Sequence, residues 1–377
     1  MSQRATRLAA LIRKEAIQTL RDRRTLAIIL ALPLIELFLF AYAIRLTVDH
    51  LPTAVADMSR DAQSRAFVTA LVNSHYFDVA GYVASQAEVI QAIDEGRAKV
   101  GVVIPPGFAV QIERGNAQVL ILLDGSDSFS VNSGYSAAVA VAQARALGLA
   151  AEQARRQGFE LKTAPITTST RVLYNPDLND LVFIMPGLIG LLLQIMAVLT
   201  TALAVVREYE LGTIEQLLVT PARPLEMLIG KLAPNAVLML TILVNTTLAG
   251  VFWFGVPFQG DPGLFAGLAF LFVWSGLGLG LLVSAIARTQ KEAQQISVVL
   301  SLFSMLLTGF IYPRGPMPAG VRWVGNLLPL TYFIRIARGI ITKGVGLTFL
   351  WTDVVALAVY SVLILGVAAL TTRRRLD

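Results

Sequence analysis

A charged segment between two long apolar runs has the clearest chemical pattern in the sequence. Arg207, Glu208 and Glu210 begin it. Thr213-Ile214-Glu215-Gln216 follows with the form of a capping box, in which two side chains satisfy free backbone amides at the start of a helix. Pro221 ends that helix because proline has no amide hydrogen to donate. A short, rigid, acidic helix suits mechanical contact with another protein, and a solvated turn that only links two spans is the alternative. The residues assigned to the contact are Arg207, Glu208, Glu210, Gly212, Thr213, Glu215, Leu217, Leu218 and Pro221.

A row of hydroxyl side chains forms a second pattern. Ser297, Ser301, Ser304 and Thr308 follow one another at spacings of four, three and four residues, which places them on one face of a helix. Such a face could line a path for a transported substrate, with Gln194 as a polar candidate in another apolar run. Alternatively, small hydroxylated residues pack membrane helices against one another, and for any single residue packing is the favoured interpretation.

The sequence lacks the patterns that would let it supply its own energy or catalysis. A P-loop needs a second glycine followed by Lys and then Ser or Thr, but Gly230-Lys231 is followed by Leu232 and the first glycine is replaced by Leu225. The chain has no cysteine, and its two histidines, His50 and His75, are too isolated to predict a metal site. We therefore expect no enzyme activity and no cofactor in this chain, and energy for any uphill transport must come from another polypeptide.

Composition predicts a polytopic α-helical membrane protein. Hydrophobic residues make up 55% of the 377 residues and charged residues 15%, with a mean hydropathy of +0.66. A soluble protein carries about 25% charged residues. Seven Lys or Arg precede Thr25 and three more lie at 373–375, beside apolar runs, which predicts two cytoplasmic termini and no nucleic-acid surface. The six predicted spans are 25–44, 181–206, 233–256, 264–287, 295–312 and 352–371.

Residues 45–180, between the first and second spans, have a different character. Strand-like runs alternate with helical stretches, which predicts an inserted α/β domain outside the membrane, periplasmic in a bacterium with two membranes. The strands are expected at 53–56, 99–104 and 119–123, and the helices at 61–73, 86–95 and 131–156.

The remaining segments flank the spans. Residues 1–24 predict an amphipathic helix on the cytoplasmic surface, or else a basic topology signal that happens to be helical, and 372–377 form a basic cytoplasmic tail. The cytoplasmic loop covers 207–232, within a five-span region at 181–371. The external segment 313–351 is expected to hold a re-entrant helical hairpin, because its apolar middle at 321–341 is interrupted by polar residues; a seventh span there is the alternative.

Four motifs together resemble those of a known family. They are Tyr174-Asn175-Pro176, the Arg207-Glu208-x-Glu210-x-Gly212-Thr213-x-Glu215 signature, Leu217-Leu218-x-Thr220-Pro221, and Gly230-Lys231-Leu232. Over nearly its full length the sequence is similar to permease subunits of ABC-2-type exporters, specifically to bacterial multidrug-export permeases with a large external domain after the first span.

The resemblance implies an assembly in the bacterial inner membrane. Two permeases, either two copies or a copy with a sister chain, would join two cytosolic P-loop ATPase subunits that hold ATP and Mg, and a periplasmic adaptor would meet the external domain. Residues 208–221 would dock into the ATPase, and amphiphilic drug-like or lipid-like compounds would leave the cytoplasm or the membrane.

Two other functions remain open. One is export of a lipid or glycan rather than of drugs. The other is a non-transporting receptor or scaffold, whose external domain senses a ligand and whose cytoplasmic loop signals.

Overall fold

The computed structural model describes residues 3–44, 48–126, 128–156, 173–177, 179–212 and 224–376. The chain divides into two compact units. We call Met1–Ile44 with Val172–Asp377 the helical unit, and Arg45–Arg171 the α/β unit.

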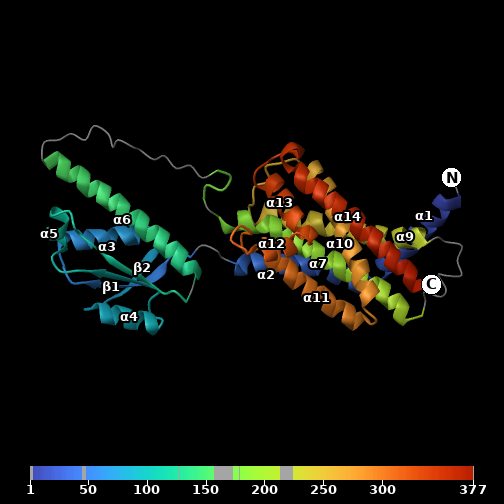
Figure 1. Ribbon diagram of the computed structural model, residues 1–377, viewed down its shortest axis with the longest axis horizontal. Helices are drawn as coiled ribbons and strands as arrows, with labels where there is room; N and C mark the ends of the chain where they lie inside the picture. The colour runs from blue at the N-terminus through green and yellow to red at the C-terminus, as the bar shows by residue number, and fades with distance from the viewer. Residues whose placement is uncertain are drawn as a thin grey trace. The chain divides into compact units, whose positions relative to one another are not determined.

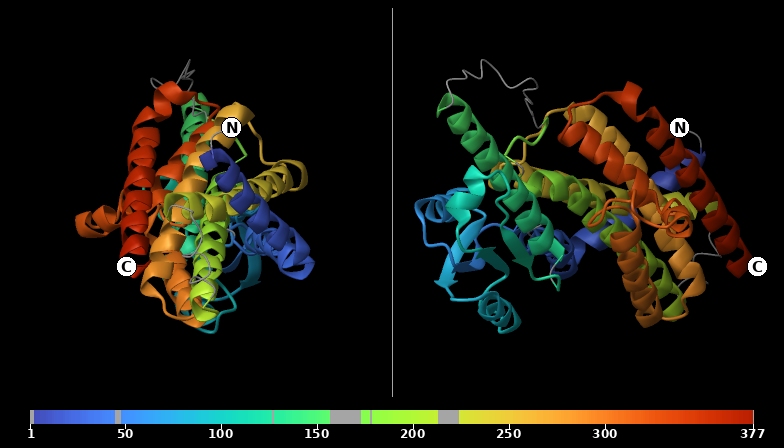
Figure 2. Two further views of the ribbon diagram at one scale, coloured as in Figure 1. Left: turned by 90° about the vertical axis from the view of Figure 1, so that its right-hand side faces the viewer. Right: turned by 60° about the vertical axis from the view of Figure 1, so that its left-hand side comes forward.

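The helical unit is built around one long central helix, α7 (Asp180–Glu210), most of whose residues are buried. Helices α2, α9, α10, α11 and α13 all contact it, and α14 packs along α10 (Figures 1 and 2). The other elements of this unit are α1 (Gln3–Arg21), α2 (Arg23–Ala43), α9 (Pro224–Leu248), the π-helical turn η1 (Ala249–Trp253), α10 (Pro262–Ile286), α11 (Gln290–Leu307), α12 (Ala319–Gly325), α13 (Pro329–Ile341) and α14 (Leu347–Leu376).

Five helices in the described part of the chain are long and apolar enough to cross a membrane: Arg23–Ala43, Asp180–Glu210, Ile229–Trp253, Pro262–Ile286 and Leu347–Thr371. They match five of the six predicted spans. Helix α11, in the place of the sixth, has 18 residues and begins with the polar run Gln290-Lys291-Glu292, so it is not among the five. The sixth span therefore stays a prediction.

The segment 321–341 does not form one long helix. It contains most of α12 and all of α13, and Asn326, Leu327 and Leu328 separate the two helices. Helix α13 has 13 residues, which is about 20 Å of helix against a hydrocarbon core of about 30 Å. Helix α13 is also buried, with Phe333 stacked on Phe272 of α10 at a ring distance of 4.1 Å.

Close contacts between backbones hold the helical unit together. A Cβ on Gly280 of α10 would lie 2.7 Å from the Cβ of Thr201 and 2.7 Å from the carbonyl of Val198, both on α7. Helix α1 packs along α9, where a Cβ on Gly230 would lie 2.8 Å from the Cβ of Leu11. The N-terminal helix expected at the membrane surface is therefore also packed against the protein. Both chain ends lie at one end of the helical unit, with α12 and α13 at the other (Figure 1).

The α/β unit is a four-stranded sheet covered on both faces. The strand order is β2-β1-β3-β4, with β1 parallel to both neighbours and β3 antiparallel to β4. Alternation along β1 explains the layers: Leu51 and Val55 face the core formed with α3 and α6, whereas Ala54 and Ala56 face α4 (Figure 1). The elements are β1 (Leu51–Asp57), α3 (Ala62–Asn73), β2 (Phe77–Tyr82), α4 (Gln86–Asp94), β3 (Val100–Ile104), α5 (Phe108–Glu113), β4 (Leu120–Leu123) and α6 (Ser128–Arg156).

Candidate functional site

The C-terminal end of α7 carries the first residues of the predicted contact segment. The helix ends at Glu210, and Gly212 follows with a φ of +67°, in the left-handed region that glycine adopts without strain. The amides of Leu211 and Gly212 donate to the carbonyls of Arg207 and Tyr209 at 3.0 and 3.2 Å. The chain therefore leaves the helix at Gly212, directly before the predicted capping box.

Glu208 joins this end of α7 to α9. Its carboxylate forms an ion pair with the ammonium group of Lys231, and the two side chains are only 20% and 14% exposed. Such shielding makes the pair stronger than a solvated one, because less water screens the charges. Lys231, which resembles a P-loop lysine in the sequence, thus holds a carboxylate of its own chain.

Glu210 joins the same end of α7 to α11. The amide of Gln290 donates to Glu210 Oε1 at 2.8 Å, and the side-chain amide of Gln290 donates to Oε2. Thr289 accepts the amide of Glu292 at 3.2 Å, and Glu292 accepts the amide of Arg288 at 2.7 Å. Glu210 therefore completes the cap of α11 from a neighbouring helix, where a negative charge is favourable.

Arg207 lies on the same turn as these carboxylates. It is exposed, and its positive charge is a minor contribution to the low pKa of Asp22, which is due mainly to the hydrogen bond from the Thr25 hydroxyl. Of the nine residues assigned to the contact, the structure places Arg207, Glu208, Glu210 and Gly212 together at this end of α7. The others, Thr213, Glu215, Leu217, Leu218 and Pro221, lie outside the described residues.

The hydroxyl row predicted on α11 packs against α7. Gln194 of α7 donates from Nε2 to Ser304 Oγ at 2.7 Å, and both side chains are buried. The other three hydroxyls donate to carbonyls of their own helix: Ser297 to Ala293 at 2.7 Å, Ser301 to Ser297 at 2.7 Å, and Thr308 to Ser304 at 2.5 Å. Among the described residues, Gln194 Oε1 is buried without a hydrogen-bond partner. Ser304 thus links α11 to α7 within this chain, and the acceptor of Gln194 beside it is left unsatisfied.

Comparison with known proteins identifies the family. The pattern of the family described as "ABC-2 family transporter protein" matches residues 23–370. The chain belongs to the ABC-2 family. It is 32% identical over 374 residues to the probable multidrug ABC transporter permease YbhS of Escherichia coli, and the match covers 98% of each chain. It is 30% identical over 354 residues to the probable multidrug ABC transporter permease YbhR of the same organism, covering 92% of this chain and 93% of YbhR.

A more distant relative is larger than this ABC-2 protein. ABC transporter G family member 20 of Dictyostelium discoideum is 26% identical over 365 residues, which cover 94% of this chain and 49% of the relative. The family and these relatives support a role as the permease of an ABC transporter, in a multi-pass membrane protein. Membership of a permease family also implies that the chain carries no cofactor of its own.

The ABC-2 protein has a second set of polar contacts that the sequence analysis did not assign. Arg338 of α13 donates to the carbonyls of Phe183, Gly309 and Phe310, each at 3.2 Å, and its guanidinium carbon lies 3.9 Å from the centre of the Phe183 ring. It joins the start of α7 to the backbone just after α11. The sequence feature that could have indicated this contact is a basic residue within an apolar run. On a membrane helix such a residue usually faces the protein interior and pairs with other polar groups.

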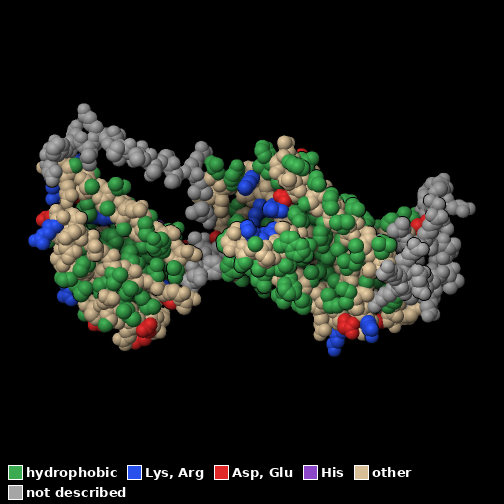
Figure 3. Space-filling view, in the orientation of Figure 1, with side chains coloured by type: hydrophobic (Ala, Val, Ile, Leu, Met, Phe, Trp, Pro, Cys, Tyr) green, Lys and Arg blue, Asp and Glu red, His purple; other side chains and the backbone are tan. Residues whose placement is uncertain are grey.

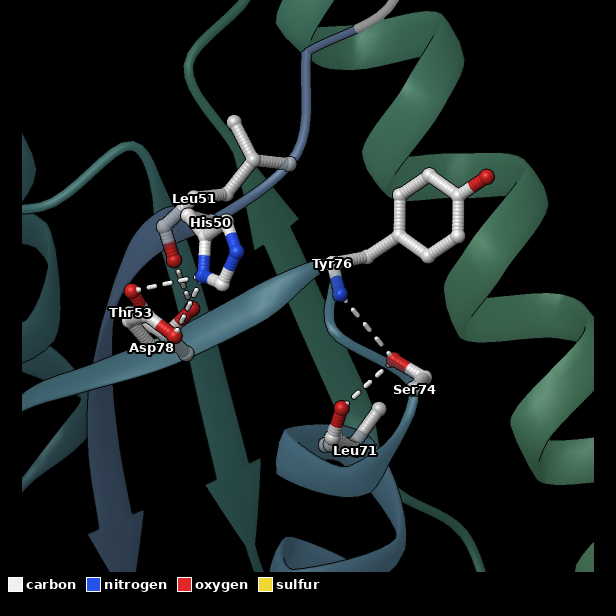
Figure 4. Close-up of polar contacts among 7 residues, drawn as sticks. All are labelled: His50, Leu51, Thr53, Leu71, Ser74, Tyr76 and Asp78. Atoms are coloured by element: carbon white, nitrogen blue, oxygen red, sulfur yellow. Dashed lines mark hydrogen bonds and ion pairs between the residues drawn. The ribbon is translucent and has the colours of Figure 1, made fainter. Parts of the chain in front are cut away.

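In the α/β unit, a histidine and an aspartate lie near a serine, as the parts of a catalytic triad do (Figure 4). His50 Nδ1 lies 3.1 Å from Asp78 Oδ2, and this contact raises the pKa of His50, but both side chains are more than half exposed. The Ser74 hydroxyl already donates to the carbonyl of Leu71 at 2.5 Å and accepts the amide of Tyr76 at 3.4 Å. These contacts describe a surface ion pair beside a helix cap, and not a serine triad, which needs serine bonded to histidine.

Proposed function

We propose that this chain is the membrane permease subunit of an ATP-driven exporter of amphiphilic drug-like or lipid-like compounds. Cytosolic P-loop ATPase subunits would hold ATP and Mg and supply the energy. The observation that carries the proposal is the end of α7, where Glu208 and Glu210, the first carboxylates of the predicted ATPase-contact segment, contact two other helices. The names of the relatives YbhS and YbhR support the substrate class.

The proposed topology has six spans, with both termini in the cytoplasm of a bacterial cell and the α/β unit on the other side of the inner membrane. Helix α11 is the sixth span. Its 18 residues give about 27 Å of helix, close to the thickness of a hydrocarbon core. One face packs on α7, and the other exposes large apolar side chains, as a lipid-facing helix does: Val298, Val299, Leu302, Phe303 and Leu306.

The absence of cysteine makes this topology directly testable. Gly320→Cys on α12 and Arg288→Cys between α10 and α11 both introduce a thiol at an exposed position. An impermeant maleimide added to spheroplasts should label Gly320→Cys at once, and Arg288→Cys only after the membrane is opened. Equal labelling of both variants in closed spheroplasts, or the reverse order, would refute the six-span arrangement.

The contacts at the end of α7 suggest how ATP binding is coupled to the spans. A push on residues 208–221 by the ATPase would displace the end of α7. Glu208 would pass that displacement to α9 through Lys231, and Glu210 would pass it to α11 through Gln290. Packed helices switch between discrete arrangements rather than deforming continuously, so the spans would rearrange as rigid bodies.

The proposed substrate path runs along α7 and α11, at the face where a second permease copy or a sister chain would meet this one. Its candidate polar residues are Gln194, Ser297, Ser301, Ser304 and Thr308. Gln194 supports this placement because its unsatisfied buried oxygen is available to a donor that enters. A periplasmic adaptor would receive the substrate at the α/β unit.

Charge reversal tests the coupling. Glu208→Lys, Glu215→Lys and Lys231→Glu should each abolish substrate-stimulated ATPase activity of the assembled complex while membrane insertion is retained. The swap Glu208→Lys with Lys231→Glu should restore stimulation if the pair transmits the displacement. Glu113→Lys, at an exposed position in the α/β unit, is the control and should leave stimulation unchanged. Unchanged stimulation in both Glu208→Lys and Glu215→Lys would refute the coupling role.

A pull-down separates the exporter from its alternatives. The chain would be isolated in mild detergent from its native membrane, and the proteins that accompany it identified by mass spectrometry. A P-loop ATPase in equal amount supports export, whereas its absence at several salt concentrations favours the receptor or scaffold. Transport assays in proteoliposomes would then distinguish drugs from a lipid or glycan.

A further inference from the structure

The end of the helical unit that carries α12 and α13 has a concentration of Lys and Arg side chains (Figure 3). We call Arg314, Arg322 and Arg335 the arginine cluster. Arg314 Nη2 donates to Asn326 Oδ1 at 2.8 Å and to the carbonyl of Arg322. Arg335 Nη2 lies 2.7 Å from Asp353 Oδ1. The three side chains thus belong to the loop before α12, to α12 and to α13, and the hydrogen bond to the carbonyl of Arg322 ties Arg314 to α12.

The arginine cluster has more positive charge than its surroundings balance. Burial lowers the pKa of Arg314, and the neighbouring charges of Arg335 and Arg322 lower it further. In the described part of the chain, Asp353 is the one carboxylate that pairs with the cluster. Arg314 Nε is buried and has no hydrogen-bond partner among the described residues. Like charges held this close, with a buried donor unused, are stabilised when an anion binds between them.

The surface around the arginine cluster is apolar and aromatic. On α12 and just after it, Trp323 is 64% exposed and Leu327 53% exposed, and Tyr312 precedes the cluster with 52% of its surface exposed. Exposed tryptophan and tyrosine are typical of the boundary between lipid headgroups and hydrocarbon. A free phosphate ion would gain nothing from such a rim, whereas a ligand with acyl chains would cover it.

We propose that the arginine cluster binds the phosphate of an anionic phospholipid, whose acyl chains lie against Trp323 and Leu327. Guanidinium groups suit this ligand because their planar N–H donors match phosphate oxygens and are weakly hydrated at a membrane surface. Arg322 is exposed and Arg335 half exposed, so both can reach a headgroup, while Arg314 supplies the more buried donor. The assignment of this lipid to the outer leaflet rests on the proposed topology, but binding itself does not.

Lipid binding can be measured on the full chain without the ATPase. The protein in nanodiscs of phosphatidylcholine would be titrated with short-chain phosphatidylglycerol, and the bound lipid counted by native mass spectrometry. Arg322→Gln should weaken binding about fivefold. Arg322→Lys should keep most of the affinity, because it retains the charge. Arg288→Gln, an exposed arginine at the opposite end of the helical unit, is the matched control and should bind like the parent chain.

The outcomes separate lipid from other anions. Inorganic phosphate at the same concentration should fail to displace the lipid; displacement would show a site for free phosphate and overturn the proposal. Affinity in Arg322→Gln equal to that of the parent would also overturn it, and would be expected if this surface docks an acidic protein instead. Because no transport is measured, failure of the exporter proposal would leave this result intact.

Discussion

Arg338 offers the most quantitative test of how the helical unit is held together. Its guanidinium group bonds three carbonyls, of which those of Gly309 and Phe310 follow the end of α11 at Leu307. Both residues are buried, so water cannot replace the lost donors. We expect Arg338→Met, which keeps much of the side-chain volume but no donor, to destabilise the helical unit.

The size of the effect follows from two opposing contributions. Each buried carbonyl left without a donor costs about 1–3 kcal/mol, and loss of the contact with the Phe183 ring costs about 1 kcal/mol more. Against this, removing a partly buried cation relieves a desolvation penalty of a few kcal/mol. The carbonyls after α11 also carry the negative end of that helix dipole, which favours a cation there. We therefore expect a net loss of about 3 kcal/mol, or a fall of about 6–12 °C in the unfolding midpoint.

Thermal unfolding of the purified protein in detergent, at one scan rate, would measure this fall. Arg338→Lys should lie between the parent and Arg338→Met, because lysine keeps the charge but lacks the planar fork. Arg335→Met is the control on the same helix: its ion pair with Asp353 is half exposed and should contribute about 0–1 kcal/mol. An Arg338→Met midpoint equal to or above that of the parent would show that desolvation outweighs the hydrogen bonds, and the reasoning would be wrong.

Two further predictions concern each unit separately. Lys99 and the Ser126 groups hold the pKa of Asp124 at about 2, below its ordinary value, so the ionised carboxylate contributes stability above about pH 4 that is lost as pH falls towards 2. Asp124→Asn should therefore lower the calorimetric midpoint of the α/β unit at pH 7 and change it much less at pH 2, where the carboxylate of the parent is protonated in much of the folded protein; an equal change at both would contradict the pairing. Gly280→Val should lower the unfolding midpoint of the helical unit by the equivalent of about 1–3 kcal/mol, because it forces α10 away from α7. Gly267→Val in the same helix meets open space, and an equal loss there would attribute the effect to helix propensity instead.

Hydropathy and local residue patterns predicted the helices and strands well where the residues of a single segment determine its structure. Apolar runs gave five helices that are long and apolar enough to span a membrane, and strand-like runs alternating with helical stretches gave the three predicted strands and three predicted helices of the α/β unit. Strand β2 was missed because Asp78 and Gly81 are residue types depleted in strands, and only pairing with β1 makes that segment extended. The polar start of α11 was left out of the predicted span, although Thr289 caps the helix there.

Contacts between helices could not be predicted, because spacing along one helix does not reveal which helix it faces. Glu208 and Glu210 were assigned to contact with another protein, yet their carboxylates bind Lys231 and Gln290 of the same chain. Gln194 and Ser304 were both selected as polar residues in apolar runs, but nothing in the sequence brings them together across 110 positions. Their role in coupling or transport remains a prediction.

The positions of these contacts restrict how α7 and α11 can move. Glu210 bonds the start of α11, Gln194 bonds Ser304 farther along it, and Arg338 holds the carbonyl of Phe183 together with those that follow α11. Helix α7 is about 46 Å long, so these ties lie near both of its ends and between them. Sliding or separating the two helices would break all three, whereas tilting them as one body breaks none. A substrate path along α7 and α11 therefore cannot open between these two helices and has to open toward helices of another chain. For this reason we place the path where a second permease would meet this one.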